Sequence, residues 1–318
     1  MNYLGIDLGG TNIVAAVVNE KFEIVSEAKN PTLCPRPWKE ILDDVAKTAL
    51  EAAKMANLKM SDFPFVGIGS PGVISVETGT VIVAVNLGFD NVPLTEYLSK
   101  KLGIPVILEN DANAAAWGEA VAGAARGTQN SVMITLGTGV GGGVIIGGKV
   151  FSGFNYAGTE LGHIVIDYNG RQCTCGRRGC WETYSSATAL VAMTKEKLDE
   201  CARTGRKTLM TDIVAQQGKI NGRTAPDAMR MGDEAAKEVY DVYVRYLACG
   251  LTNIVNIFQP EVISLGCGVS NEGQSLIDAI LPIVRAEQYG GDVVELTQLR
   301  IAELGNDAGI IGAAALEQ

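Results

Sequence analysis

The sequence predicts an α/β protein made of two similar halves. One observation is that short strands rich in β-branched residues alternate with helical segments along the chain. The other is that each half opens with the same pattern, a strand, a glycine turn and a second strand. The repetition indicates a duplicated domain, with the two turns facing a cleft between the halves. The paired strands are residues 4–7 and 12–18 in the first half, and residues 131–137 and 141–150 in the second.

Length and composition narrow the class of protein. A chain of 318 residues predicts two domains, at about 100–200 residues each. The formal net charge of -10 argues against a nucleic-acid-binding surface. No apolar run approaches the roughly 18 residues that span a bilayer. The first ten residues lack the basic start and apolar core of a signal peptide. We therefore expect a cytoplasmic protein that binds neither nucleic acid nor membrane.

The first half contains clear helix and strand patterns. Residues 37–56 place apolar side chains at helical spacing, with charges on the other face, which predicts an amphipathic helix. Its apolar positions are Ile41, Leu42, Val45, Ala49 and Ala52. The run IPVIL at 104–108 is apolar throughout and predicts a strand buried on both faces. The other expected elements are a strand at 65–69, a turn at 70–72, a helix at 94–102 and an alanine-rich helix at 112–125.

The second half becomes helical beyond residue 186. Two strands are expected to interrupt the helices, and no low-complexity linker separates independent modules. The expected helices are 187–201, 208–217, 232–258, 272–285 and 307–316, and the expected strands are 261–265 and 299–302.

The first glycine turn, residues 8–11, suggests a phosphate site. Asp7 closes the preceding strand, and the glycines leave backbone N–H groups open. This combination suits a phosphate held by the turn, with Asp7 facing a magnesium ion or its water shell. A plain hairpin turn would use the same residues, so both interpretations stay open at this point.

Polar residues follow the predicted strand at 104–108. They are Glu109, Asn110 and Asp111. Ligand sites in open α/β sheets lie beyond the carboxyl ends of strands, which makes Asn110 and Asp111 candidate site residues. The alternative is that Asp111 only caps the following helix.

The second glycine turn also satisfies a dinucleotide-binding pattern. Residues 137–142, GTGVGG, match G-x-G-x-x-G. That fingerprint must open a helix, whereas the residues that follow continue as β-structure. We therefore reject a dinucleotide site and interpret the turn as a second phosphate clamp.

The segment 160–182 predicts a zinc site. It contains the only histidine, His163, and three of the seven cysteines, Cys173, Cys175 and Cys180. The spacing C-x-C-x4-C, with the histidine ten residues upstream, can close a tetrahedral Cys3His site. Such a site has no open position, so the zinc would be structural. Three reduced cysteines in a surface loop are the alternative. Disulfides are less expected in a reducing compartment.

Several motifs together resemble the ROK family of sugar kinases and repressors. They are DLGGT at 7–11, ENDANAAA at 109–116, LGTGVGGG at 136–143, ELGH at 160–163 and CTCGRRGCWE at 173–182. The resemblance covers essentially the whole chain. It implies two actin-like (ribonuclease H-like) domains of the hexokinase type, with a nucleotide and sugar cleft between them and a zinc-binding loop. The implied domains are residues 1–117 with 303–318, and residues 118–302.

The resemblance also implies roles for individual residues. Asp111 matches the catalytic base, and zinc bound by His163 and the three cysteines would fix the His163 ring so that its free nitrogen meets a sugar hydroxyl. The implied sugar-binding residues are Gly72, Asn86, Asn110, Asp111, Glu160, His163 and Glu182. The implied nucleotide-binding residues are Asp7, Gly9, Gly10, Thr11, Asn12, Gly137, Thr138, Gly139, Gly266 and Gly268. Cys267 interrupts the last glycine run and departs there from the family's pattern.

The activity implied by the resemblance is ATP-dependent phosphorylation of a hexose, with glucose at O6 as the leading case and with Mg²⁺ and one Zn²⁺ per chain. It further implies a homodimer or homotetramer. N-acetylmannosamine, N-acetylglucosamine and fructose stay alternative substrates, and polyphosphate an alternative donor. A sugar-binding repressor is disfavoured, because DLGGT starts at residue 7 and leaves no room for a helix-turn-helix domain. A catalytically inactive zinc protein is disfavoured because Asp7, Asp111 and both glycine turns are present.

Overall fold

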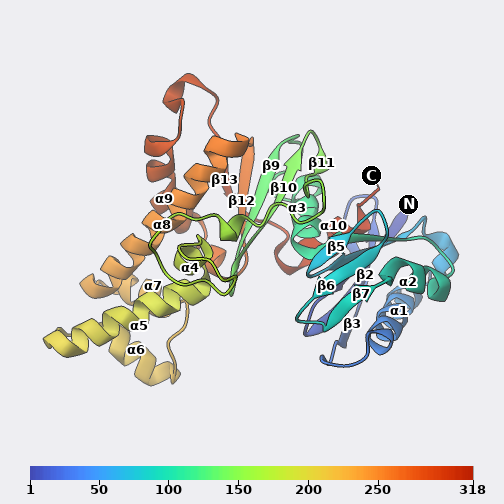
Figure 1. The fold of residues 1–318 in the computed structure, drawn as a ribbon, viewed down its shortest axis with the longest axis horizontal. Coiled ribbons are helices and arrows are strands. Elements are labelled where there is room, and N and C mark those ends of the chain that lie inside the picture. The colour runs from blue at the N-terminus through green and yellow to red at the C-terminus, as the bar shows by residue number, and fades with distance from the viewer. Residues whose placement is uncertain (318) are drawn as a thin grey trace. The chain divides into compact units, whose positions relative to one another are not determined.

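The computed structural model, shown in Figure 1, describes residues 1–317, the side chain of residue 292 excepted. The chain forms two compact units. Unit 1 contains residues 1–133, residues 142–159 and the segment from 302 onward, and unit 2 contains residues 134–141 and 160–301. This grouping places 118–133 and 142–159 with the first unit, unlike the boundaries expected from the sequence, which stay a prediction.

The first sheet has the strand order β3-β2-β1-β4-β8. β1 pairs antiparallel with β2 and parallel with β4, and β4 pairs parallel with β8. β1, β4 and β8 therefore end at the same edge. The strands are β1 (Asn2–Leu8), β2 (Asn12–Asn19), β3 (Ile24–Pro31), β4 (Val66–Ser70) and β8 (Val106–Asn110).

The second sheet repeats this arrangement. Its order is β11-β10-β9-β12-β13, so when the strands of each sheet are numbered along the chain, both sheets read 3-2-1-4-5. The predicted duplication is confirmed. The strands are β9 (Ser131–Leu136), β10 (Val140–Ile146), β11 (Lys149–Val150), β12 (Val262–Gly266) and β13 (Gln298–Ile301).

Helices cover both faces of the first sheet. Alternation along β1 sends Leu4, Ile6 and Leu8 into a core shared with α1. The other face of β1 meets α10, where a Cβ on Gly5 would lie 2.1 Å from the carbonyl oxygen of Ile310. α3 packs beside α10. The helices of unit 1 are α1 (Trp38–Met55), α2 (Leu94–Leu102), α3 (Asp111–Val121) and α10 (Ala308–Ala314).

A long helix, α8, organises the helical part of unit 2. It buries one apolar stripe and packs against α5, α7 and α9. Trp181 is fully buried against it and donates a hydrogen bond from Nε1 to the carbonyl oxygen of Tyr246 at 3.0 Å. The helices are α4 (Glu182–Ser185), α5 (Ala187–Thr204), α6 (Leu209–Gln217), α7 (Thr224–Arg230), α8 (Glu234–Phe258) and α9 (Gln274–Glu287).

Several expected boundaries were wrong by two to four residues, among them those of the strand and the helix that meet at Asn110 and Asp111. The strand expected at 104–108 runs from Val106 to Asn110, because ladder pairing with β4 extends through Glu109 and Asn110. The helix expected at 112–125 ends at Val121. The residues that follow leave the helix because Glu119 binds their amides instead, with its carboxylate accepting from Ala124 N at 2.7 Å.

Several elements were missed. β3 is polar and half exposed, so it carries little hydrophobic signal. Residues 73–92 form a small sheet of order β5-β6-β7 whose strands are too short for a period of two to be recognised. α7 was also missed. The strands are β5 (Val73–Ser75), β6 (Thr80–Ala84) and β7 (Phe89–Val92). Within residues 1–317, none of the helices has the length and apolar character needed to cross a membrane.

The close approach of α10 to the first sheet generates a stability prediction. A Cβ on Gly67 would lie 1.8 Å from the carbonyl oxygen of Ala313, so Gly67→Ala must push α10 off β4. We expect a loss of about 1–3 kcal/mol in unfolding free energy, measured by denaturant titration. Gly222→Ala is the control, because its Cβ would have only an ordinary contact at 3.9 Å with Ala187. Equal stability of both variants would contradict the packing.

Candidate active site and metal cluster

The carboxyl edge of the first sheet gathers the predicted acidic residues of unit 1. Asp7 on β1 is the register partner of Gly69 on β4, and Gly69 is the partner of Glu109 on β8. Asp111 begins α3 immediately after β8. Parallel strands that end together place Asp7 and Asp111 on one edge, as expected for a ligand site in an α/β sheet.

Asn110, and not Asp111, caps helix α3. Its Oδ1 accepts hydrogen bonds from the amides of Ala112 and Asn113, at 2.9 and 3.2 Å, and its Nδ2 donates to the carbonyl oxygen of Gly72 at 3.2 Å. The interpretation of Asp111 as a simple N-cap is therefore wrong. The Asn110 oxygen is thus committed to the helix, while its Nδ2 serves Gly72 and the Asp111 carboxylate.

Glu109 stabilises the start of α3 through hydrogen bonds. It is buried, and its Oε1 accepts from the Asn110 amide at 2.8 Å and from Asn113 Nδ2 at 3.1 Å. Burial raises the pKa of Glu109, while these two hydrogen bonds oppose the rise. The sequence alone indicated no role for Glu109. The structure shows that it orders the backbone that carries Asn110 and Asp111.

The two aspartates resist ionisation. Burial raises the pKa of Asp7 to about 6, and the neighbouring charge of Asp111 adds to the rise. Burial also raises the pKa of Asp111, although the Ala112 amide and the Asn110 side chain oppose it by hydrogen bonding. A nearby cation would remove much of this cost. The edge is therefore suited to a hydrated divalent ion, and Asp111 is suited to accept a proton.

The first glycine turn stands next to Asp7. Gly9 donates its amide to the carbonyl oxygen of Asn12 at 2.9 Å, which closes the turn. The Thr32 hydroxyl donates to the Gly9 carbonyl oxygen at 2.6 Å, and the Thr32 amide donates to the carbonyl oxygen of Thr11 at 2.9 Å. Thr32, which lies outside the turn, thus fixes the backbone of the turn, and Thr11 is exposed. Asn86 lies against Gly10, with its Nδ2 3.5 Å from where a Cβ would stand.

Gly72 is required at its position by two constraints. Its φ is +99°, and a Cβ there would lie 2.1 Å from the carbonyl oxygen of Val83. The sharp turn that follows aims its carbonyl oxygen at Asn110 Nδ2. Gly72 therefore belongs to the site through its backbone.

The second glycine turn is held by the start of α5 in unit 2. The Ala187 amide donates to the carbonyl oxygen of Gly137 at 2.8 Å, and the Thr188 hydroxyl donates to that of Thr138 at 2.7 Å. The last glycine run is adjacent, because Cys267 Cβ lies 3.9 Å from the Cβ position of Gly137. Gly266 ends β12 and Gly268 follows Cys267. The predicted nucleotide residues of unit 2 thus form one group.

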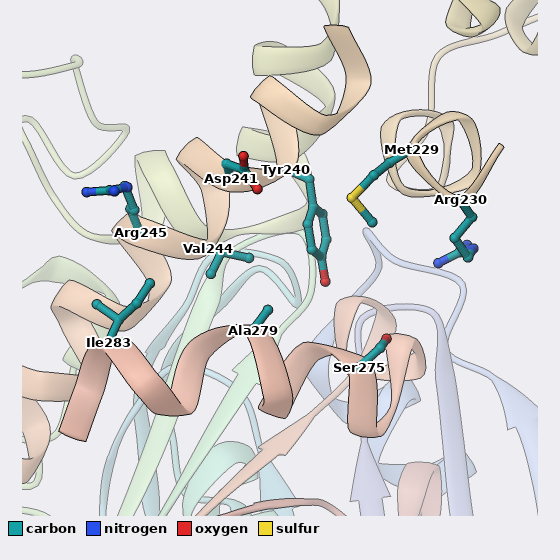
Figure 2. Close-up of a pocket in the computed structure, with 9 residues that line it drawn as sticks. All are labelled: Met229, Arg230, Tyr240, Asp241, Val244, Arg245, Ser275, Ala279 and Ile283. Atoms are coloured by element: carbon teal, nitrogen blue, oxygen red, sulfur yellow. The ribbon is translucent and has the colours of Figure 1, made fainter. Parts of the chain in front are cut away.

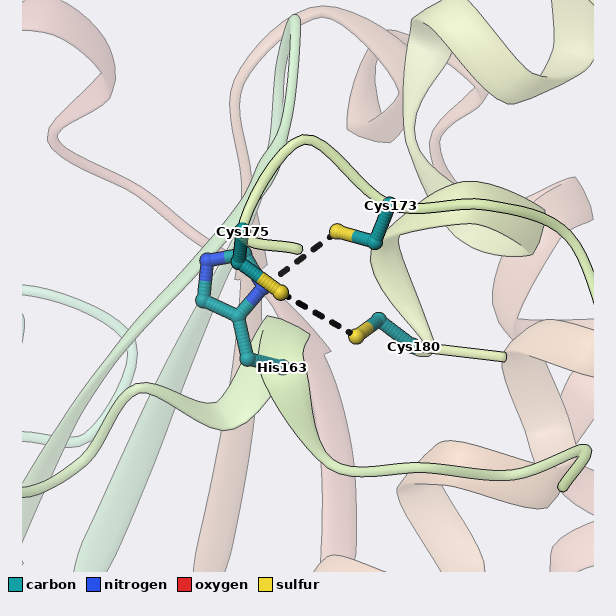
Figure 3. Close-up of side chains that lie close together, drawn as sticks. All are labelled: His163, Cys173, Cys175 and Cys180. Atoms are coloured by element: carbon teal, nitrogen blue, oxygen red, sulfur yellow. Dashed lines mark hydrogen bonds between the residues drawn. The ribbon is translucent and has the colours of Figure 1, made fainter. Parts of the chain in front are cut away.

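The four predicted metal ligands come together in unit 2 (Figure 3). His163 Nδ1, and the sulfurs of Cys173, Cys175 and Cys180, all lie within 4.8 Å of one another. Cys173 Sγ is 3.7 Å from His163 Nδ1, and Cys175 Sγ is 3.6 Å from Cys180 Sγ. Ligands on a tetrahedral zinc ion would be about 3.6–3.8 Å apart. The four side chains therefore fit such an ion.

Two further features suit a cation at this cluster. Burial and the neighbouring thiols raise the pKa of Cys180 to about 12, so a thiolate there needs a positive partner. Gly176 and Gly179 have φ of +91° and +74°, which allows the tight turns that bring close ligands onto one ion. With Nδ1 of His163 facing the cluster, its Nε2 is left for another partner.

Glu182 connects the metal cluster to the second glycine turn. Its Oε1 lies 3.9 Å from Cys173 Sγ, and its Oε2 accepts from the Val140 amide at 3.1 Å. A Cβ on Gly139 would be 2.2 Å from the same Oε2, so a side chain there would displace the Glu182 carboxylate. Glu160 precedes His163 and is exposed; its carbonyl oxygen accepts the His163 amide at 3.0 Å.

A separate cavity of about 520 Å³ lies among α7, α8 and α9 (Figure 2). Tyr240 and Val244 from α8 face Ala279 from α9 across it, and Arg230 stands at one end, ion-paired with Asp227 and Glu272. No residue of the predicted site lines it. It takes no part in the chemistry considered below.

Comparison with known proteins places the chain in context. The chain is 37% identical to a glucokinase of Streptomyces coelicolor over 98% of its length and 96% of that protein. It resembles the crystal structure of a ROK family glucokinase from Streptomyces griseus in complex with glucose and AMPPNP. That likeness has a TM-score of 0.79 and 35% identity, and covers 99% of both chains.

Regulators share the fold as well. The chain is 29% identical to the xylose repressor of Bacillus spizizenii, over 98% of its own length and 76% of the repressor. The sequence profile of the ROK family matches residues 3–318. The two-domain, actin-like α/β fold and the motifs at both glycine turns agree with that match, and the chain therefore belongs to the ROK family.

Proposed function

We propose that this protein transfers the terminal phosphoryl group of ATP to a hexose, with glucose and its 6-hydroxyl as the leading case. The observation that carries the proposal is Asp111, a carboxylate placed beside Asp7 and a phosphate-type glycine turn. Whole-length similarity to glucokinases supports it, as does the likeness to a glucokinase that binds glucose and an ATP analogue.

Asp111 is proposed as the general base. Its raised pKa makes it a better proton acceptor than an exposed aspartate. The sugar hydroxyl attacks the γ-phosphorus, a new O–P bond forms, and the bond to the β-phosphate oxygen breaks with ADP as leaving group. The hydroxyl proton passes to an oxygen of Asp111. Phosphoryl transfer depends mainly on positioning and charge neutralisation, so the order that Glu109 and Asn110 give this turn matters for the rate.

The glycine turns and Asp7 are proposed to hold the donor. The amides of Gly9 and Gly137 are used inside the turns, so the other backbone amides of residues 9–12 and 137–139 are proposed to meet the phosphate oxygens. Asp7 would face a hydrated Mg²⁺, which neutralises phosphate charge when bound. Gly266 and Gly268 are proposed to lie on the adenosine side, next to the second turn.

The sugar hydroxyls are proposed to meet Asn86, Asn110, Glu160, His163 and Glu182, with the backbone of Gly72 shaping the turn beside Asn110. Fixed polar partners reject an analogue that leaves one of them unpaired. Glu182 has one oxygen committed to the Val140 amide, which fixes its orientation and leaves Oε1 for a ligand. His163 offers Nε2 because Nδ1 faces the cysteines.

Zinc is proposed as the resident ion of the His163, Cys173, Cys175 and Cys180 cluster. A filled Cys3His site supplies structural stability, with no open position for chemistry. Its effect on the reaction would pass through the fixed ring of His163 and through Glu182.

Alternatives within the family differ in substrate and donor. N-acetylmannosamine, N-acetylglucosamine and fructose use the same proposed residues, and polyphosphate is an alternative donor. A sugar-binding regulator is the alternative outside enzymes. The paired aspartates Asp7 and Asp111 favour a kinase, because ligand binding alone needs no buried base. A cytoplasmic location stays a prediction from the sequence, and a homodimeric or homotetrameric state stays a prediction of the resemblance.

The proposed function is tested by product formation from MgATP across glucose, mannose, fructose, N-acetylglucosamine and N-acetylmannosamine. We expect ADP release with glucose to exceed that with each other sugar, and the product to be the 6-phosphate. A preference for an acetamido sugar would change the substrate and keep the site assignments. No ADP release with any sugar would contradict kinase activity.

Replacement of the base generates a second prediction. Asp111→Asn keeps the shape of the side chain but cannot accept the proton, so kcat should fall by about 10²–10⁴-fold. The wild-type rate should also fall as pH is lowered through the raised pKa of Asp111, because the protonated acid is inactive. Asp212→Asn, at an exposed position on α6, is the control. More than a tenth of wild-type kcat in Asp111→Asn, with its thermal unfolding unchanged, would exclude this role.

The metal cluster generates a third prediction. Purified protein should contain about one zinc per chain by elemental analysis, and Cys175→Ser should lose it because one thiolate ligand is removed. Cys249→Ser is the control, since Cys249 on α8 is not one of the four clustered residues. Loss of zinc should raise the KM for glucose more than that for ATP. Zinc-free protein with unchanged kinetics would refute the role proposed for His163.

A further inference from the structure

A polar cavity lies over the first glycine turn within unit 1. Its volume is about 480 Å³, and one wall consists of Asp7 and residues 9–12. The lining also contains Lys29 from β3, with Asn306 and Asp307 from the segment before α10. None of these last three residues belongs to a site predicted from the sequence. They lie far from the turn in sequence, and the fold brings them to the same cavity.

The sheet register explains how Lys29 reaches this place. Asp7 on β1 pairs with Val14 on β2, and Val14 pairs with Lys29 on β3. Side chains of directly paired residues point to the same face of a sheet. Adjacent strands lie about 4.8 Å apart, so the Cα of Lys29 stands about 10 Å from that of Asp7. The four-carbon stem of a lysine lets its ammonium group cover much of that distance.

Lys29 differs in the sign of its charge from the other ionisable residues that line the cavity. Asp7, Glu27 and Asp307 contribute carboxylates, whereas Lys29 is the one cationic side chain in the lining. Across residues 1–317 no ion pair or hydrogen bond engages its ammonium group, although Glu27 stands two positions away on the same strand. The ammonium group is therefore available to an anionic ligand.

The glycine turn itself supplies no cation. Residues 8–12 read Leu-Gly-Gly-Thr-Asn, so a phosphate there would meet backbone amides beside the repelling carboxylates of Asp7 and Asp307. A triphosphate carries several negative charges, and its binding depends on neutralising them. Lys29 is the lining side chain that can add positive charge from the protein.

We propose that Lys29 binds the terminal phosphates of ATP above the first glycine turn and sets the affinity for the donor. The inference rests on the proposed kinase function, because that function brings a triphosphate to this turn. The inference adds Lys29 to the residues that carry out this function. Lys29 lies on an edge strand and in none of the motifs shared with the family.

A role that involves no ligand would also explain Lys29. Edge strands often carry lysines that prevent pairing with other chains, and β3 is an edge strand of the first sheet. In that case Lys29 would affect solubility and leave nucleotide binding unchanged. The two explanations predict different kinetics.

The experiment compares Lys29→Met, Lys29→Arg and Lys21→Met with the wild type. Lys21 is exposed in the turn that joins β2 to β3, so its variant removes the same charge from the same hairpin outside the cavity. We would measure KM for MgATP, KM for glucose and kcat. Titration calorimetry with MgAMPPNP would give nucleotide affinity without turnover, and thermal unfolding would show that each variant folds.

We expect Lys29→Met to raise the KM for MgATP and the Kd for MgAMPPNP by about tenfold or more, as for loss of one charge-assisted hydrogen bond. Lys29→Arg should stay within about threefold of wild type, and the KM for glucose should not change. Lys21→Met should match the wild type.

Nucleotide affinity in Lys29→Met equal to that of wild type would overturn the inference and leave the kinase function standing. An equal loss in Lys21→Met would also overturn it, because the effect would then come from net charge. A wild-type protein that neither binds MgAMPPNP nor turns over ATP would overturn the kinase function, and this inference with it.

Discussion

The close packing of α10 on the first sheet is the constraint on which the site in unit 1 depends. Gly5 and Gly67 present bare backbone to the helix, and any side chain there would collide with it. The helix therefore lies directly over β1 and β4. A Cβ added to Gly309 would lie within 3.8 Å of the Asp7 carboxylate. This contact partly buries Asp7, raises its pKa, and brings the preceding segment, residues 306–307, to the first glycine turn.

Unit 2 is organised around Glu182 in a comparable way. One carboxylate oxygen fixes the second glycine turn through Val140, and the other approaches Cys173 of the metal cluster. The metal ligands, the turn and the start of α5 are thereby tied together. A structural ion in the cluster would stabilise the whole group, which gives a physical reason for metal to affect a reaction in which it takes no chemical part.

The sequence predicted the fold class, the duplication and most helices, because their signals are local. The spacing of apolar residues was enough to predict the buried face of α1, and a glycine marked the end of α2. The cysteine spacing predicted the metal cluster for the same reason. Non-local effects were missed. The capping by Asn110, the support from Glu109 and the ending of α3 at Val121 depend on hydrogen bonds that leave no periodic pattern in the sequence. The placement of Lys29 required the register of β3, an edge strand with almost no hydrophobic signal.

The proposed reaction requires the Asp111 carboxylate to take the proton of the hydroxyl that attacks ATP. A crystal structure of the protein with glucose and MgAMPPNP would show which group meets the reacting oxygen. We expect an Asp111 oxygen about 2.6–3.2 Å from the glucose 6-hydroxyl. Glucose bound with that hydroxyl facing another residue, and with Asp111 out of hydrogen-bonding reach, would rule out Asp111 as the base.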